Sequence, residues 1–146
     1  KIIGQPILAP DIKYFEFLKS IKRKLNLGNA VNFIGFVPYS KIQKYYKDSG
    51  IVVGLTPDGG IDKTILEGMA SGCLTITSNS ACKKYFNSYS DKLLFSYRNP
   101  ESLAEKIISL GRLPSKNKKD ISDFLVRSVS SHHRLEDVID RISALL

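Results

Sequence analysis

The 146-residue sequence contains no tryptophan, one methionine and only two cysteines. Cys73 and Cys82 have a spacing that matches no zinc or redox motif, and two cysteines do not build a disulfide framework. This low cysteine content favours a reduced protein, and we expect a cytoplasmic one. No apolar run approaches the roughly 20 residues that cross a bilayer, and the first residues lack the features of a signal peptide.

Motifs for several kinds of chemistry are also absent from the sequence. It contains no P-loop, dinucleotide-binding fingerprint, kinase motif or nucleophile elbow. His132 and His133 are adjacent and cannot share one helix face, so we expect a surface pair and no metal site. We expect Tyr45 and Tyr46 to be packing residues. The first residue is lysine rather than methionine, which predicts a fragment or a processed piece.

Positive charge is in excess, with 22 lysines and arginines, 14 acidic residues and a formal net charge of +8. Part of the excess lies at 116–119. Another part lies on the first predicted helix, at Lys13, Lys19, Lys22, Arg23 and Lys24. It favours anionic partners, including an anionic membrane contacted peripherally at its inner face; the alternative is a solvated helix face and loop. Aromatic residues do not alternate with the basic ones, which disfavours nucleic acid.

Short apolar runs alternate with helical patterns, which is typical of βαβ units. We therefore expect an α/β fold, a Rossmann-like parallel sheet flanked by helices, in one domain over 1–146 with a C-terminal helical extension over 112–146. Strands are predicted at 2–4, 31–34, 51–55, 74–77 and 93–95. Helices are predicted at 11–28, 40–50, 61–71, 100–111, 120–130 and 134–145, with a flexible connection at 111–119.

The segment 54–72 is the most informative part of the chain. The apolar run 51–55 predicts a strand buried on both faces, and a glycine-rich loop leads from it into a helix. Ligands of open parallel sheets bind beyond the carboxyl ends of the strands, where a helix N-terminus suits a phosphate. Gly59 and Gly60 let the backbone approach such an anion closely. The anion would also lower the cost of placing the Lys63 cation in the first turn of the helix.

Glu67 lies farther along this helix. Its carboxylate could accept hydrogen bonds from two adjacent ribose hydroxyls, and a hydrogen bond to a charged group contributes roughly 1.5–3 kcal/mol. The alternative is a surface acid on an amphipathic helix, and spacing alone does not decide between the two.

Several stretches, in this order, carry a family resemblance: VNFIGFV at 31–37, DSGIVV at 48–53, ILEGMASG at 65–72, LLF at 93–95 and NPESLA at 99–104. Together they resemble the C-terminal, nucleotide-sugar-binding domain of family-four retaining glycosyltransferases with the GT-B fold. The similarity covers about 2–110, and its most specific part is 66–72.

The resemblance implies roles for individual residues. Glu67 matches the acid that grips the nucleotide ribose. The loop and helix start that face the diphosphate and donor sugar match Ile61, Asp62, Lys63 and Thr64. The turn beside the nucleotide base matches Gly35, Phe36 and Val37, and Gly4 matches a glycine that lines the same cleft.

Two departures from the family pattern limit this reading. The family's other acid, which contacts the donor sugar, falls at Gly59; Asp58 or Asp62 could replace it, although Asp62 could instead stabilise the helix start. The resemblance also implies that this piece lacks the family's first strand, with its diphosphate-binding Arg and Lys, and the N-terminal acceptor-binding domain. We therefore expect weak donor binding, poor catalysis, and a gap, a repaired pairing or an exposed edge in the sheet.

The implied activity is transfer of a sugar from a nucleoside-diphosphate donor to a hydroxyl of a glycan, lipid or protein acceptor, with retention. The nucleotide sugar is a substrate, and no cofactor is expected. One alternative is a non-catalytic Rossmann-like nucleotide-binding or regulatory module. The other is a nucleotide-sugar epimerase, for which no catalytic acids are recognised.

Overall fold

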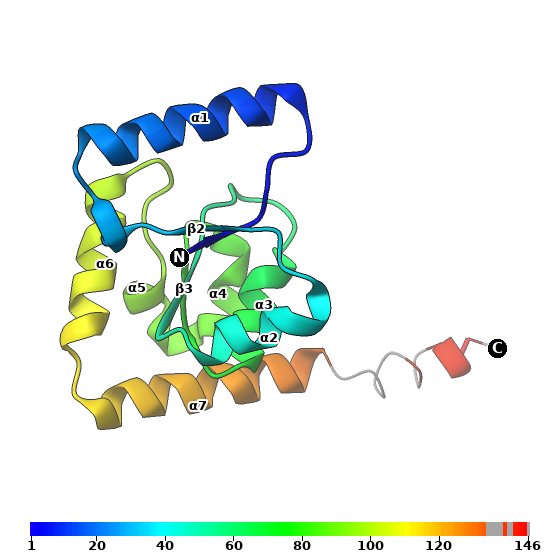
Figure 1. Ribbon diagram of the computed structural model, residues 1–146. Coiled ribbons are helices and arrows are strands. Elements are labelled where there is room, and N and C mark those ends of the chain that lie inside the picture. Colours follow the sequence, from blue (N-terminus) through cyan, green and yellow to red (C-terminus); the bar gives the residue numbers. More distant parts are fainter. Residues whose placement is uncertain (134–138, 140–141, 146) are drawn as a thin grey trace. The chain divides into compact units, whose positions relative to one another are not determined.

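The computed structural model describes residues 1–133, 139 and 142–145 (Figure 1). The chain folds as two compact units, Lys1–Ile42 and Gln43–Leu146. Parallel strands flanked by helices occur in both units, which confirms the predicted Rossmann-like α/β class. The expectation of a single domain stays a prediction. Within the described residues, no helix is long and apolar enough to span a membrane.

The first unit is a βαβ arrangement. Strand β1 (Ile2–Ile3) pairs in parallel with β2 (Phe33–Gly35), and α1 (Ala9–Lys24) and the 3-10 helix η1 (Gly28–Ala30) connect them. The ring of Phe15 on α1 meets the ring of Phe33 edge-on, with centroids 5.1 Å apart. Phe15 therefore joins α1 to this short sheet, whereas Tyr14 and Phe17 of the same helix are exposed.

The predicted ends of α1 were wrong. The helix begins before Asp11, whose carboxylate accepts a hydrogen bond from the backbone N–H of Leu8 at 3.4 Å. Asp11 is thus the third helical residue, and it satisfies an N–H group at the helix start rather than preceding the helix. Gly28 does not cap the C-terminus, because α1 ends at Lys24 and Gly28 belongs to η1.

The second unit is built on two parallel strands in register, β3 (Ile51–Gly54) and β4 (Leu74–Thr77), which α3 (Lys63–Ala70) connects. The remaining helices are α2 (Tyr39–Lys47), η2 (Ser80–Cys82), α4 (Lys83–Phe86), η3 (Asn87–Tyr89), α5 (Ser90–Leu93), α6 (Pro100–Arg112) and α7 (Ser115–His132), of which α2 crosses the boundary between the units. The predicted strand 93–95 is only one parallel bridge between Leu94 and Thr77, because α5 occupies the residues up to Leu93.

Helix α3 lies unusually close to the strands beneath it, and two glycines permit this. A Cβ built at Gly68 would stand 3.1 Å from Cβ of Val52, and one built at Gly54 would stand 2.3 Å from Cδ1 of Ile65. A larger residue at either position would force Val52 or Ile65 to shift. The predicted burial of 51–55 on both faces was wrong in part, because 38% of Val53 and 65% of Leu55 are exposed.

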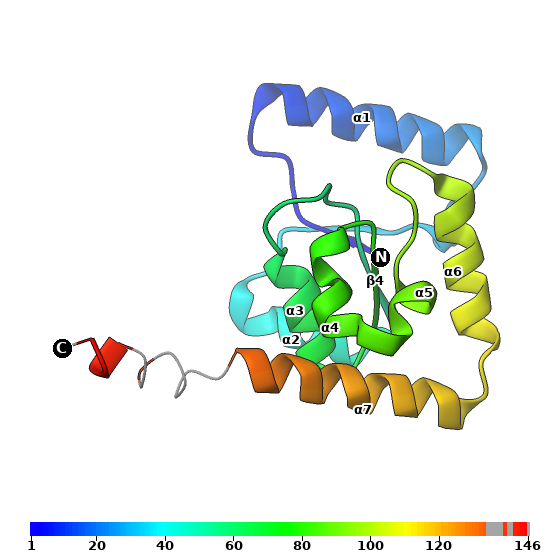
Figure 2. The same cartoon turned by 180° about the vertical axis from the view of Figure 1, so that it is seen from behind.

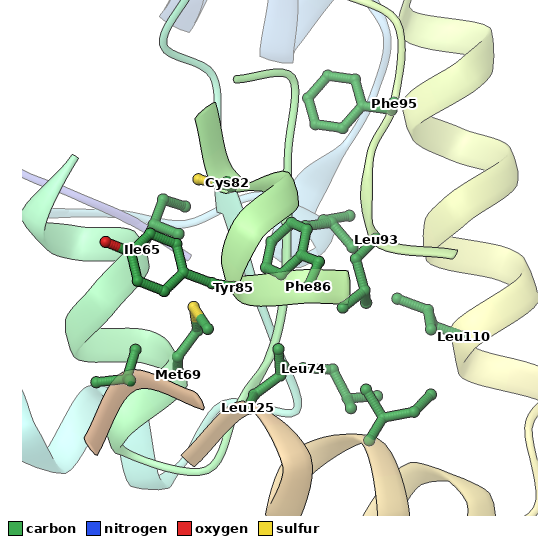
Figure 3. Close-up of a cluster of buried hydrophobic side chains, with 13 residues drawn as sticks. Ile65, Met69, Leu74, Cys82, Tyr85, Phe86, Leu93, Phe95, Leu110 and Leu125 are labelled. Carbon is green, nitrogen blue, oxygen red and sulfur yellow. The ribbon is translucent and has the colours of Figure 1, made fainter. Parts of the chain in front are cut away.

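The core of the second unit gathers side chains from β4 and from α3 through α7 (Figure 3). Its buried hydrophobic members are Ile65, Met69, Leu74, Ile76, Cys82, Tyr85, Phe86, Leu93, Phe95, Leu110, Ile121, Leu125 and Val129. Burial raises the pKa of the Cys82 thiol to about 11, so this cysteine is a neutral core residue.

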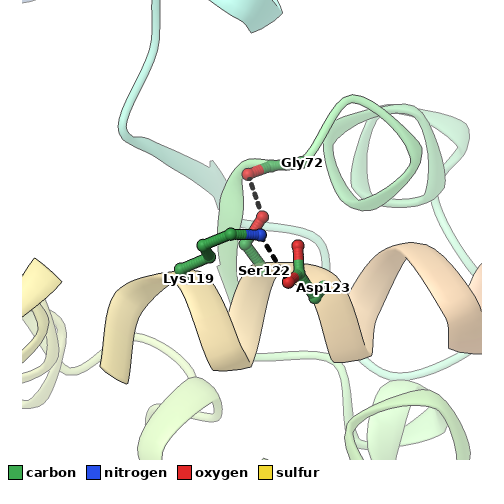
Figure 4. Close-up of polar contacts among 4 residues, drawn as sticks. All are labelled: Gly72, Lys119, Ser122 and Asp123. Carbon is green, nitrogen blue, oxygen red and sulfur yellow. Dashed lines mark hydrogen bonds and ion pairs between the residues drawn. The ribbon is translucent and has the colours of Figure 1, made fainter. Parts of the chain in front are cut away.

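Helix α7 contributes three of these core residues, although the sequence predicted a flexible connection at 111–119. Only Leu113 and Pro114 separate α6 from α7. Helix α7 runs along α3 and α4 in both views (Figures 1 and 2). Its Ser122 hydroxyl donates to the carbonyl oxygen of Gly72 at 2.7 Å, while Lys119 pairs with Asp123 (Figure 4). The predicted helix 134–145 lies largely outside the described residues.

Candidate functional site

The N-terminus of α3 is capped by an aspartate. Asp62 precedes the helix, and its carboxylate accepts a hydrogen bond from the backbone N–H of Thr64 at 2.9 Å. Such an N-cap satisfies one of the unpaired N–H groups of the first turn. Asp62 therefore takes the helix-stabilising role that the sequence left open. Lys63 and Thr64 are exposed at this end of the helix, and the half-buried Ile61 packs against the core.

The glycine-rich loop before α3 is held by the segment that follows β4. The buried Asn79 donates from its side chain to the carbonyl oxygen of Gly60 at 3.0 Å. Asp58 accepts a hydrogen bond from the backbone N–H of Ser80 at 2.6 Å. Hydrogen bonds from Ser80, first from its backbone and then from its hydroxyl, hold the pKa of Asp58 below its ordinary value. Both ends of the 58–60 stretch are therefore tied to residues 79–80.

Gly59 is the loop position at which the resembling family carries an acid. It is exposed, with a φ of +146°, and a Cβ built there meets no atom within 4 Å. The space for a side chain is present, but this backbone conformation disfavours any residue other than glycine. The neighbouring carboxylates of Asp58 and Asp62 are already hydrogen-bonded to the chain's own backbone.

Glu67 is half-buried on the side of α3 that faces α2. Its Oε2 accepts a hydrogen bond from the hydroxyl of Tyr46 at 2.9 Å. Burial, followed by this hydrogen bond, raises the pKa of Tyr46 above its ordinary value, so the hydroxyl remains a donor. The thiol of Cys73 donates to the carbonyl oxygen of Tyr46 at 3.1 Å. Among the described residues, Oε1 of Glu67 has no hydrogen-bond partner and can accept from a ligand.

The other predicted donor-binding residues form a group of their own within Lys1–Ile42. Gly4 donates its backbone N–H to the carbonyl oxygen of Gly35 at 2.9 Å, which brings the two strand ends together. The side chain of Phe36 is 66% exposed, and Val37 is half-buried. The structure thus assembles the predicted site residues in two sets, one in each unit.

Sequence reasoning missed three residues of this region: Tyr46, Asn79 and Ser80. The expectation that Tyr46 is a packing residue was incomplete, because its hydroxyl orients the candidate ribose ligand, Glu67. Asn79 and Ser80 come after β4, with only Ser78 between, and lie at the carboxyl ends of the strands together with the loop that they hold. Their position after a buried parallel strand was the signal that could have identified them.

Residues 1–123 match the protein-family model described as glycosyl transferases group 1. Comparisons with curated proteins and with solved structures gave no match. The family match spans every predicted site residue and the first half of α7. It agrees with the parallel α/β architecture. The chain therefore belongs to the group 1 glycosyl transferases.

Proposed function

We propose that this chain binds a nucleoside-diphosphate sugar and forms the donor side of a retaining glycosyl transfer to a hydroxyl acceptor. The observation that carries the proposal is the hydrogen bonding of the Glu67 carboxylate. One of its oxygens is fixed by Tyr46, and the other has no partner among the described residues. A half-buried carboxylate oriented in this way is suited to the paired hydroxyls of a ribose.

The diphosphate is proposed to lie at the start of α3. Asp62 uses the N–H of Thr64, while the exposed Lys63 adds a positive charge at the same helix end. The helix dipole and this ammonium group would stabilise the charge that develops on the leaving diphosphate. Gly60 keeps the loop free of side-chain atoms close to that anion.

Residues of the first unit are proposed as further donor contacts. Gly4, Gly35 and Val37 would lie along the nucleotide, and the exposed Phe36 would offer an apolar edge to its base. The acceptor is proposed to be a glycan, a lipid or a protein, with no cofactor required. The basic residues in the last turn of α1 (Lys22, Arg23 and Lys24) support peripheral contact with an anionic membrane, because each contributes about 1 kcal/mol near its surface.

A non-catalytic donor-binding or regulatory module is the second candidate. Gly59 stands where the family's other acid is expected, and the nearby Asp58 and Asp62 are held by Ser80 and Thr64. With neither carboxylate released, the chain would hold a nucleotide sugar without assisting transfer. Release of free nucleotide from a nucleotide sugar in the presence of acceptors would establish the catalytic function, because a binding module releases none.

Both candidate functions require nucleotide binding, and calorimetric titration of the chain with UDP, GDP and ADP tests it. We expect one nucleotide to bind best and Glu67→Gln to weaken it by about tenfold or more, the cost of one charge-assisted hydrogen bond. Glu105→Gln is the matched control, because Glu105 is exposed on α6 and its loss changes the charge equally. Equal affinities of the Glu67→Gln variant and the unaltered chain would refute the ribose role.

A further inference from the structure

Two cavities of the second unit adjoin beyond the carboxyl end of β4, and neither includes a residue of the proposed donor site. They share Ser78 and Phe95 as a common wall. One has a volume of about 340 Å³ and the other about 330 Å³. Their linings differ in chemistry, which gives the combined site two distinct halves.

The first half is apolar, with a cation beside it. Its walls include Leu55, Phe95, Tyr97, Pro100 and Leu103. Leu55 is 65% exposed and Tyr97 is 47% exposed, so apolar surface at this concave place faces solvent. The guanidinium carbon of Arg98 lies 5.3 Å from the centre of the Tyr97 ring, and its backbone has a φ of +57°. Arg98 and Tyr97 both line this half, so the positive charge of Arg98 lies next to the cavity.

The second half is polar and positively charged. Its walls include Ser78, Ser80, Lys83, Ser96, Ser102 and Lys106. No carboxylate side chain lines either half among the residues that the structure describes. The nearby carboxylate of Asp58 has the opposite charge, and it accepts a hydrogen bond from the backbone N–H of Ser80. Two ammonium groups with several hydroxyls therefore surround one space.

The hydrogen bonds of this polar half leave donors for a ligand. The Ser102 hydroxyl accepts from the backbone N–H of Ser96 at 3.1 Å, so its own proton is free to be donated. Among the described residues, the hydroxyl of Ser96 and the ammonium group of Lys83 have no hydrogen-bond partner. Lys106 donates to the carbonyl oxygen of Asp91, and an ammonium group has further protons to offer. Such donors match the several acceptor oxygens of a phosphate monoester.

We propose that the paired cavities bind an amphiphile with a phosphate head group, its head among the serines and lysines and its hydrocarbon chain against Leu55, Tyr97 and Leu103. Charge complementarity selects the anionic head, since Lys83, Lys106 and Arg98 supply three positive charges. The exposed apolar surface of Leu55 and Tyr97 in the other half selects the hydrocarbon chain. The inference goes beyond the proposed function and does not depend on Glu67.

Binding of decyl phosphate below its micelle concentration, measured by calorimetry, tests this inference, with inorganic phosphate and decanol as the two half-ligands. We expect decyl phosphate to bind at least about tenfold more tightly than either half-ligand. Lys83→Met should weaken decyl phosphate at least about fivefold and leave decanol unchanged. Leu55→Ser should weaken decyl phosphate but not inorganic phosphate.

The controls separate this site from the donor site and from nonspecific charge. Lys116→Met removes one exposed lysine of α7 and should leave binding unchanged, as should Glu67→Gln. Equal affinity for inorganic phosphate and decyl phosphate would reduce the site to a free-anion site and overturn the proposal. So would equal affinity for decanol and decyl phosphate, or no heat of binding at millimolar concentrations. Circular dichroism of each variant verifies that it is folded.

Discussion

Replacing Tyr46 by phenylalanine tests how Glu67 is held. The change removes only the hydroxyl that donates to Oε2 of Glu67 at 2.9 Å and keeps the ring. A hydrogen bond to a charged group contributes roughly 1.5–3 kcal/mol, but water can reach this half-buried carboxylate and replace part of it. We therefore expect a loss of about 1 kcal/mol in unfolding free energy, or about 3 °C in Tm. Because Glu67 then loses its fixed orientation, nucleotide affinity should fall about threefold.

Urea unfolding and nucleotide titration measure these two effects on the same variant. The raised pKa of Tyr46 adds a pH signature, because its stabilising contribution is complete below the ordinary tyrosine pKa of about 10 and is lost above it. The stability difference between the unaltered chain and Tyr46→Phe should therefore shrink above about pH 10. Tyr39→Phe is the matched control, since Tyr39 is 80% exposed.

A double-mutant cycle of Tyr46→Phe with Glu67→Gln provides the refutation. If the hydroxyl acts through the carboxylate, the two changes are coupled, and the double variant is more stable than the sum of the single effects predicts. Coupling within about 0.3 kcal/mol of zero, together with unchanged nucleotide affinity, would mean that Tyr46 contributes packing alone.

Three further predictions concern the frame of the site. Gly68→Ala should lower the unfolding free energy by about 1–3 kcal/mol, because the added methyl group overpacks the contact with the sheet. Gly111→Ala should raise the unfolding free energy by about 0.5–1 kcal/mol, because the space around Gly111 is open and alanine favours the helix. Urea unfolding measures both changes. Asp62→Ala should cost about 0.5–2 kcal/mol through the lost N-cap, and an unchanged urea midpoint would contradict that role. Because the pKa of Asp58 is lowered by Ser80, Asp58→Asn should destabilise the chain at neutral pH, and the difference should vanish as the pH falls below about 4 in an acid-dependent unfolding series.

The sequence predicted the local frame of the second unit well. The strands 51–55 and 74–77 and the helix between them were placed within a few residues, because β-branched runs, a glycine-rich loop and helical spacing agree there. The start of α7 was missed because the lysines of 116–119 suggested a solvated loop. Lysine is nevertheless a good helix former, and packing of Ile121 on the core extends the helix backwards through them.

The candidate site was predictable only in part. Glu67 was proposed as a site residue from its motif and stays a prediction, whereas its partner Tyr46 lies 21 positions earlier and meets it only through the packing of two helices. No periodicity within either helix encodes that meeting. The ties from Asn79 and Ser80 to the loop are also nonlocal, since they depend on the parallel pairing of β3 with β4. Spacing describes one element at a time, and these contacts join different elements.

The ties between residues 58–60 and 79–80 make two stretches of backbone move as one. Asp58 and Gly60 cannot shift without stretching hydrogen bonds of 2.6 and 3.0 Å, so the entry to α3 inherits any displacement of the turn after β4. Ser80 also belongs to the wall of the polar cavity. A ligand in the polar cavity that moved this wall would therefore change the affinity of the α3 entry for its own ligand. By thermodynamic reciprocity, a ligand at the α3 entry would change the affinity of the polar cavity by the same factor.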